Sequence, residues 1–254
     1  MSKKVSAFVL LNRQVAWHLD WRGGILRSFR FDNRLSGLRF DLCAVQELGL
    51  VFSAATDRVA EPLLRVSDFK VRTARQTRAD RAVFELQSSG LKIGVKLHFQ
   101  LEGPTRRKWV EATNPGKKPL LLLDVEIDDF TTEAATTAGA AGKPVFIEEE
   151  VFAAIEHPAG TSLGDKGRVR MAHYPGRVLA PGGQFRSHAA LVSVAPSGQA
   201  AAHFISYIQA KSRPRPKMMS VYTPFGINNQ FGSSPTLDDE QMLDVLGLLR
   251  NFRK

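Results

Sequence analysis

Segments with the composition of β-strands follow one another along residues 1–195, with almost no helical pattern between them. They are rich in β-branched and aromatic residues, and Gly, Pro or Asn separates them. The candidate strands are 5–11, 26–31, 35–42, 69–73, 82–87, 91–101, 107–114, 120–130 and 145–155. Many strands without helices between them predict a mostly β chain in which residues 1–195 form a large antiparallel β-sandwich.

Three local patterns refine this prediction. Residues 91–101 (LKIGVKLHFQL) alternate apolar and polar side chains, so one face of that strand packs on a core. The connector 115–119 (PGKKP) predicts a hairpin between segments 107–114 and 120–130. Residues 131–142 (TTEAATTAGAAG) are small and predict a mobile surface loop. We expect Trp17, Trp21 and Trp109 to pack in the core or between sheets.

The pattern changes after Pro196. Residues 198–211 have the spacing of a helix, and a connector of alternating Arg and Pro follows, so 196–217 is the predicted linker. Residues 218–254 predict a strand, a polar loop and a helix that begins near Thr236. A strand that leads into a helix opens a parallel layer, and its strand needs a parallel partner. We therefore expect 218–254 to be the first βα unit of an incomplete (β/α)8 barrel.

Composition argues against several functions. The single Cys43 excludes an internal disulfide, and the six histidines lack metal-ligand spacing, so no metal or cofactor is expected. No apolar run is long enough to span a membrane, and the N-terminus reads as a strand rather than an export signal, which favours the cytoplasm. The net charge of +10 comes mostly from single arginines along strands. We therefore expect no nucleic-acid surface, although 106–108 (RRK) and 213–217 are compact basic runs.

Four segments, read in order, carry a resemblance to a known family: 107–125, 151–158 (VFAAIEHP), 174–182 (YPGRVLAPG), and 204–226 with its helix end, connector and VYTPFG. Over residues 100–254 the chain resembles the N-terminal β-supersandwich, linker helix and first barrel unit of α-galactosidase (melibiase)-like glycoside hydrolases. The resemblance implies that the catalytic aspartates lie on later barrel strands, so that no residue here inherits them. It also implies an aromatic residue, usually Trp, beside the sugar; Tyr222 or Phe225 stands there, which leaves the sugar open.

The loop after residue 222 holds the best candidate binding residues. Aromatic faces stack on sugars and amides bond to hydroxyl groups, and the loop combines Tyr222 and Phe225 with Asn228 and Asn229. The alternative is a loop whose aromatic side chains pack on the sandwich.

Few acidic residues of the chain are candidates for a catalytic role. Retaining glycoside hydrolysis needs two carboxyl groups about 5 Å apart. Adjacent strand residues point to opposite faces, so we expect Glu148–Glu150 to be solvated. Glu156 and His157 at a strand end could contact a sugar or move a proton, as in aldose epimerases, or could form a hydrogen-bonded turn before Pro158.

The sequence therefore predicts the non-catalytic N-terminal portion of a carbohydrate-active enzyme, which supports the barrel and shapes the sugar site. Its expected partners are a galactoside or other glycoside and the missing C-terminal barrel, not nucleic acid or a membrane. Two alternatives stay open: a stand-alone carbohydrate-binding or oligomerisation sandwich, and an epimerase-like enzyme. Whether the chain itself is an enzyme, its sugar and its oligomeric state are not determined by the sequence.

Overall fold

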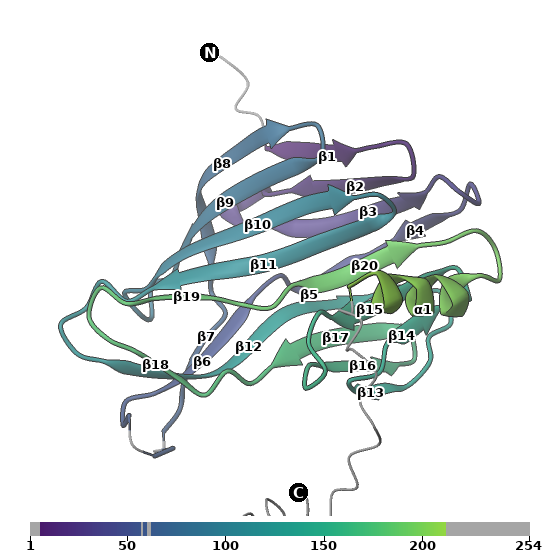
Figure 1. Ribbon diagram of the computed structural model, residues 1–254. Coiled ribbons are helices and arrows are strands. Elements are labelled where there is room, and N and C mark those ends of the chain that lie inside the picture. Colours follow the sequence, from purple (N-terminus) through teal and green to yellow (C-terminus); the bar gives the residue numbers. More distant parts are fainter. Residues whose placement is uncertain (1–5, 57, 60–61, 212–254) are drawn as a thin grey trace, which may run out of the picture. The chain divides into compact units, whose positions relative to one another are not determined.

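The computed structural model describes residues 6–56, 58–59 and 62–211, and these form an antiparallel β-sandwich, as the sequence predicts (Figure 1). The predicted barrel unit 218–254 lies outside the described residues, and with it Tyr222, Phe225, Asn228 and Asn229. The described strands belong to three sheets, and every strand pairing between them is antiparallel. The first sheet has the order β1 (Ala7–Leu11), β2 (Val15–Asp20), β3 (Arg27–Asn33), β4 (Arg39–Asp41), with a 3-10 turn at Arg22–Gly24.

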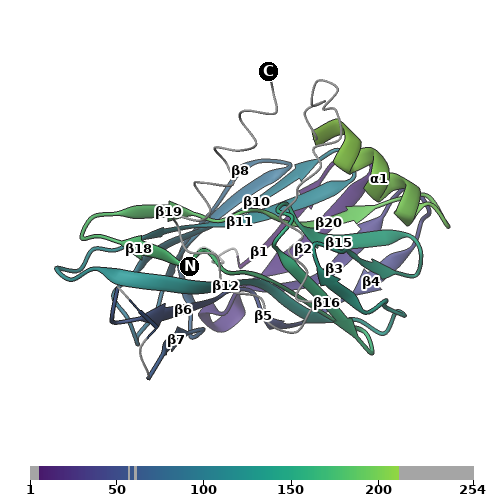
Figure 2. The ribbon, with the colours of Figure 1, turned by 60° about the horizontal axis from the view of Figure 1, so that its bottom comes forward.

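The second and third sheets face each other (Figure 2). The second runs β14 (Val145–Ile147), β15 (Val151–Ile155), β20 (Ala190–Val194), β11 (Thr105–Thr113), β10 (Gly94–Glu102), β9 (Arg81–Gln87), β8 (Lys70–Arg78), with β19 (Gln184–Arg186) also paired to β11. The third runs β13 (Gly139–Ala141), β16 (Thr161–Asp165), β17 (Arg168–His173), β12 (Leu120–Thr131), β6 (Gly49–Ser53), β7 (Leu64–Val66), with β5 (Cys43–Gln46) and β18 (Arg177–Leu179) also paired to β12.

One apolar core receives side chains from all three sheets. The alternation predicted for 91–101 is confirmed, because Val95, Leu97, Phe99 and Leu101 of β10 are all buried. Trp17 is also buried, where its ring stacks on a neighbouring ring with 5.1 Å between centroids.

The other two tryptophans differ in their surroundings. Trp21 packs beside Phe8 and Phe84 at the margin of this core. Trp109 belongs to a second apolar cluster, with Phe152 and Leu191. This second cluster lies under the helix α1 (Ala200–Lys211), which matches the helix predicted for 198–211. The helix packs through Phe204 and Tyr207, whose rings lie 5.2 and 5.9 Å from that of Phe152.

The predicted hairpin across 115–119 is wrong. β11 pairs with β10, β19 and β20, whereas β12 pairs with strands of the third sheet, so the connector crosses between sheets. Asn114 closes this crossing, because its amide donates to the carbonyl oxygens of Lys118 (2.8 Å) and Leu179 (2.9 Å). Side-chain hydrogen bonds to the main chain thus replace the strand-to-strand bonds of a hairpin.

The predicted strand 145–155 is two strands, β14 and β15, joined by a tight turn. Glu148 and Glu149 are exposed there and adopt positive φ angles of 49° and 54°. Glu150 differs, because it is 4% exposed and accepts hydrogen bonds from Asn33 of β3 and from Ser36 in the turn between β3 and β4. The expectation of a solvated triplet therefore holds for two of its residues and is wrong for Glu150.

The small residues of 131–142 are not simply a mobile loop. Residues Gly139–Ala141 form β13, which pairs with β16. At Gly139, where φ is 66°, an added Cβ would lie 2.2 Å from the carbonyl oxygen of Ser162. The small side chains allow this close approach of two backbones.

Four charged side chains lie buried between the sheets. Arg106 and Lys108 of β11 are 0% exposed, and both bind Asp128 of β12, at 2.6 and 2.7 Å. Lys108 also pairs with Glu47, which accepts the backbone N–H of Ser28. We call these four residues, Arg106, Lys108, Asp128 and Glu47, the core charge network; its formal charges sum to zero.

Removing one partner of the core charge network should destabilise the sandwich strongly. Asp128→Ala leaves two buried cations short of a carboxylate, and breaking a buried ion pair costs about 3–5 kcal/mol. Urea unfolding should show a loss of that size. The matched control is Asp41→Ala at an exposed carboxylate, expected to change the free energy of unfolding by less than about 0.5 kcal/mol. Equal stability of the two variants would contradict the role assigned to the network.

Candidate functional site

Glu156 follows β15 at the strand end, as the sequence predicts, but its carboxylate is already engaged. One oxygen accepts a hydrogen bond from Arg107 of β11, and the other accepts the Tyr207 hydroxyl of α1 at 2.8 Å. Burial and the bond to Glu156 raise the pKa of Tyr207 above its usual value. Glu156 therefore joins α1 to the second sheet.

His157, the next residue, points to different neighbours. Its ring Nδ1 accepts a hydrogen bond from the backbone N–H of Ala159 at 3.1 Å. Its backbone N–H donates to the carbonyl oxygen of Ile155 at 2.7 Å, and these bonds form the turn before Gly160. The ring lies 4.2 Å from that of His188, between centroids. Glu156 and His157 are thus adjacent in sequence but belong to separate contacts.

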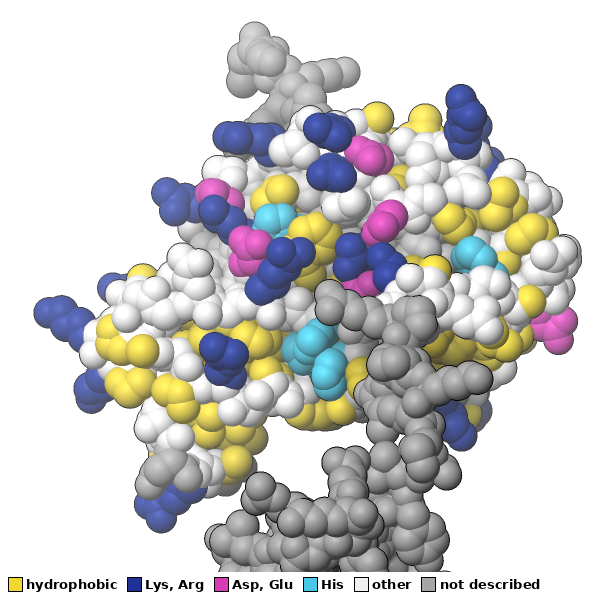
Figure 3. Space-filling view, viewed as in Figure 1, with side chains coloured by type: hydrophobic (Ala, Val, Ile, Leu, Met, Phe, Trp, Pro, Cys, Tyr) yellow, Lys and Arg dark blue, Asp and Glu magenta, His cyan; other side chains and the backbone are white. Residues whose placement is uncertain are grey.

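The ring of His157 lines an open hollow of about 510 Å³ at the margin of the two large sheets. We call it the histidine hollow; its other lining residues are Ala159, His173, Tyr174, Pro175, Arg177, Gln184, Phe185, Arg186 and His188. Histidine side chains gather on the face seen in Figure 3, beside hydrophobic and basic side chains. β17, β18, β19 and the turn after β15 position these groups, so both sheets contribute to the hollow.

Two histidines of the hollow have lowered pKa values. His173 is 4% exposed, and burial together with His188 and His157 lowers its pKa to about 4. Burial and His157 also lower the pKa of His188. The ring of His173 is therefore neutral at pH 7, and its buried Nε2 has no hydrogen-bond partner among the described residues.

A second hollow of about 650 Å³ lies on the outer face of the second sheet and shares Gln184, Phe185 and Arg186 with the first. Its lining also includes charges of both signs: Arg72, Glu85, Lys96 and Glu111. Nearby, Trp109 stacks on His98 at 4.9 Å and lies under the Arg186 guanidinium at 4.9 Å. We call this second hollow, on the outer face of the second sheet, the sheet hollow.

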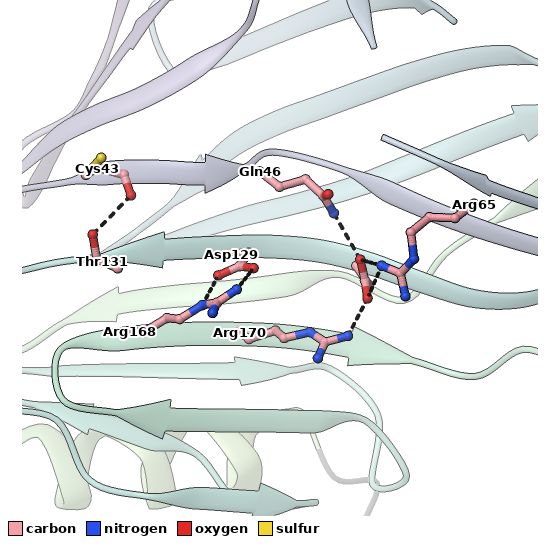
Figure 4. A network of polar contacts seen from close by, with 8 residues as sticks. Cys43, Gln46, Arg65, Asp129, Thr131, Arg168 and Arg170 are labelled. Carbon is pink, nitrogen blue, oxygen red and sulfur yellow. Dashed lines mark hydrogen bonds and ion pairs between the residues drawn. The ribbon is translucent and has the colours of Figure 1, made fainter. Parts of the chain in front are cut away.

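Acidic side chains of β12 form a row that the sequence analysis did not identify. Glu126 accepts hydrogen bonds from Gln46 and Arg65 and pairs with Arg170. Asp129 accepts two from Arg168, at 2.8 and 2.6 Å. Figure 4 shows these arginines around the strand.

Asp124, two positions before Glu126, is the exception in this row. Its Oδ1 is buried with no partner among the described residues, and burial and Glu126 raise its pKa to about 6. The spacing of Asp124 and Glu126 was the available signal, because residues two apart on a strand share a face.

Three kinds of site that the sequence analysis did not expect are a nucleic-acid surface, a metal site and a membrane-spanning helix. Arg106 and Lys108 of the basic run 106–108 are buried, which removes them from any nucleic-acid surface. Among the described residues, no three His, Cys, Asp or Glu side chains are placed to hold a metal ion. The one helix in the described ranges is too short to cross a membrane.

Replacing Asp124 should stabilise the protein near neutral pH. A carboxyl group whose pKa is raised by folding binds its proton more tightly when folded, so its contribution to stability falls as pH rises from about 4 to 6. Asp124→Asn should raise the free energy of unfolding by about 1–3 kcal/mol at pH 7 and change it little near pH 4. Urea unfolding at both pH values measures this, with exposed Asp165→Asn as control. A gain that is the same at both pH values would contradict the assignment.

No known family profile matches the sequence, and no curated protein matches it. Two GH36 α-galactosidases from Geobacillus stearothermophilus have similar structures: AgaA, crystallised with 1-deoxygalactonojirimycin (12% identity, 76% of this chain, 41% of that chain, TM-score 0.49), and AgaB (11%, 78%, 41%, 0.49).

The galactosidase domain of the α-galactosidase–sucrose kinase AgaSK aligns with a TM-score of 0.52 at 9% identity, over 76% of this chain and 41% of that chain. This chain therefore spans less than half the length of these solved structures. At such low identity the likeness concerns the fold. It confirms the predicted resemblance at that level: the described residues have an α-galactosidase-like β-sandwich fold.

Proposed function

We propose that this sandwich is a non-catalytic part of a carbohydrate-active enzyme of the α-galactosidase-like glycoside hydrolase type. In this proposal it supports a catalytic barrel and shapes the sugar site, and residues 218–254 begin that barrel. The observation that carries the proposal is the likeness of fold to the AgaSK galactosidase domain.

The placement of acids in the sandwich favours a non-catalytic role. Hydrolysis with retention needs one carboxylate as nucleophile and a second as acid about 5 Å away, both facing the substrate. Glu150 accepts hydrogen bonds from Asn33 and Ser36, and Glu156 accepts hydrogen bonds from Arg107 and Tyr207. Glu126 forms salt bridges with two arginines, Arg65 and Arg170. Each of these carboxylates is thus engaged by side chains of the sandwich itself, which favours a structural role for it.

An epimerase-like activity is the second candidate, and one observation favours it. Three histidines line a hollow next to Glu156, and aldose chemistry needs a proton donor and an acceptor close together. Against it, the Glu156 carboxylate binds Arg107 and Tyr207 rather than pointing at the hollow's histidines. The two candidates therefore differ in what Glu156 does.

The purified chain should not turn over glycosides or accelerate sugar mutarotation. Aryl α- and β-glycosides report hydrolysis, and polarimetry with galactose and glucose reports mutarotation. We expect rates equal to the uncatalysed background for both. A rate above background that is lost in Glu156→Gln would contradict the non-catalytic role, and its reaction type would separate a hydrolase from an epimerase.

Neutral sugar, if bound, should bind through the loop after Tyr222, where Phe225 offers a stacking face and Asn228 and Asn229 offer amides. Phe225→Ala should weaken binding by about 1–3 kcal/mol, the size of a lost buried aromatic contact. Titration calorimetry with galactose, glucose and oligosaccharides measures this. The control is Glu149→Ala at an exposed turn, expected to change binding by less than about 0.5 kcal/mol. Unchanged affinity in Phe225→Ala would move the neutral-sugar site to the sandwich.

A further inference from the structure

We propose that the histidine hollow binds the anionic group of an acidic saccharide, a sugar that carries a carboxylate or a phosphate. The saccharide part of this inference rests on the proposed function. The anionic part rests on the hollow itself.

The charge of the lining selects an anion. None of the described residues that line the hollow is acidic, whereas Arg177 of β18 and Arg186 of β19 bring two permanent positive charges. Both arginines are exposed, and no salt bridge of either one is found among the described residues. The Arg186 guanidinium also lies over the Trp109 ring at 4.9 Å, a stacked contact that leaves the N–H groups at its edge able to bind carboxylate or phosphate oxygens, as those of Arg177 can. The sheet hollow differs, because Glu85 and Glu111 stand among its basic residues.

The histidines supply a second, independent feature. His173 is more than nine-tenths buried, lines the hollow, and has a ring nitrogen, Nε2, with no partner among the described residues. A buried polar atom without a hydrogen-bond partner lowers the stability of the folded protein, and a ligand that bonds to this atom removes the penalty. His157 and His188 lie against each other with 4.2 Å between ring centroids, so two further imidazole rings line the same hollow.

The remaining lining suits a sugar ring. The Tyr174 side chain is 63% exposed, and an exposed aromatic face can stack on the CH groups of a sugar. Gln184 adds an amide that can donate to and accept from hydroxyl groups. An open hollow of about 510 Å³ is large enough for a single sugar residue with its charged group.

Titration calorimetry at low salt tests the proposal, with galacturonate, galactose 6-phosphate, galactose and inorganic phosphate as probes. We expect at least one of the two acidic sugars to bind, and the Arg177→Gln variant to bind it roughly tenfold more weakly. His188→Gln should also weaken it. The matched control is Arg72→Gln, which removes the same charge from an exposed position lining only the sheet hollow, and should bind as wild type does.

The pKa values of individual histidines, measured by NMR, distinguish binding in the hollow from a general effect of charge on the whole protein. His157 and Glu156 act on the pKa of His188, and His173, Arg177 and Arg186 line the same hollow. An anion bound among them should raise the pKa of His188 from its lowered value, and the signal of His98, outside the hollow, should be unaffected.

Two results would overturn the proposal: no binding of either acidic sugar, or equal losses in Arg72→Gln and Arg177→Gln. In the first case, binding of inorganic phosphate alone would reject a saccharide ligand specifically. These outcomes are independent of the turnover assays with Glu156→Gln, so failure here is distinguishable from failure of the proposed function.

Discussion

The core charge network is the interaction on which the arrangement of the sheets depends. Arg106 and Lys108 come from the second sheet and Asp128 from the third, while Glu47 reaches the backbone of Ser28 in the first. Charges in an apolar interior are costly unless each finds its partner. A shift of β11 by one residue would place Arg107 in the core and turn Arg106 and Lys108 outward, so the network penalises that alternative register.

A bulge in β12 makes this network compatible with a second one. Residues two apart on a regular strand point to the same face, yet Glu126 meets the half-exposed Arg65 while Asp128 meets the buried Arg106. The register of β12 against β17 shifts between Glu126 and Asp128, which lets the two acids serve opposite sides of the sheet. The strand can therefore carry arginine pairs on its outer face and a buried carboxylate toward the core.

This bulge also marks the limit of what the sequence could predict. Alternation within one strand is local, and for β10 it gave the correct buried face, from Val95 to Leu101. The partners of Arg106 and Lys108 lie up to 61 residues away, and no local pattern reveals them, so a buried basic pair looks like a solvated one. The hairpin predicted at the connector 115–119 was wrong for the same reason. Pro and Gly favour a turn, but pairing with distant strands decides whether that turn joins neighbours or crosses between sheets.

In the candidate site too, the local sequence predicts where a residue lies on a strand, but distant residues decide what its side chain contacts. The sequence correctly placed Glu156 and His157 at a strand end, but consecutive residues at such an end face opposite ways. Glu156 meets α1, whereas His157 meets His188, which follows β19. The histidine hollow depends on both large sheets, because β18 pairs with β12 and β19 pairs with β11. The strands that carry Arg177 and Arg186 therefore pair with β12 and β11, the same two strands that bring Asp128 and Arg106 together in the core.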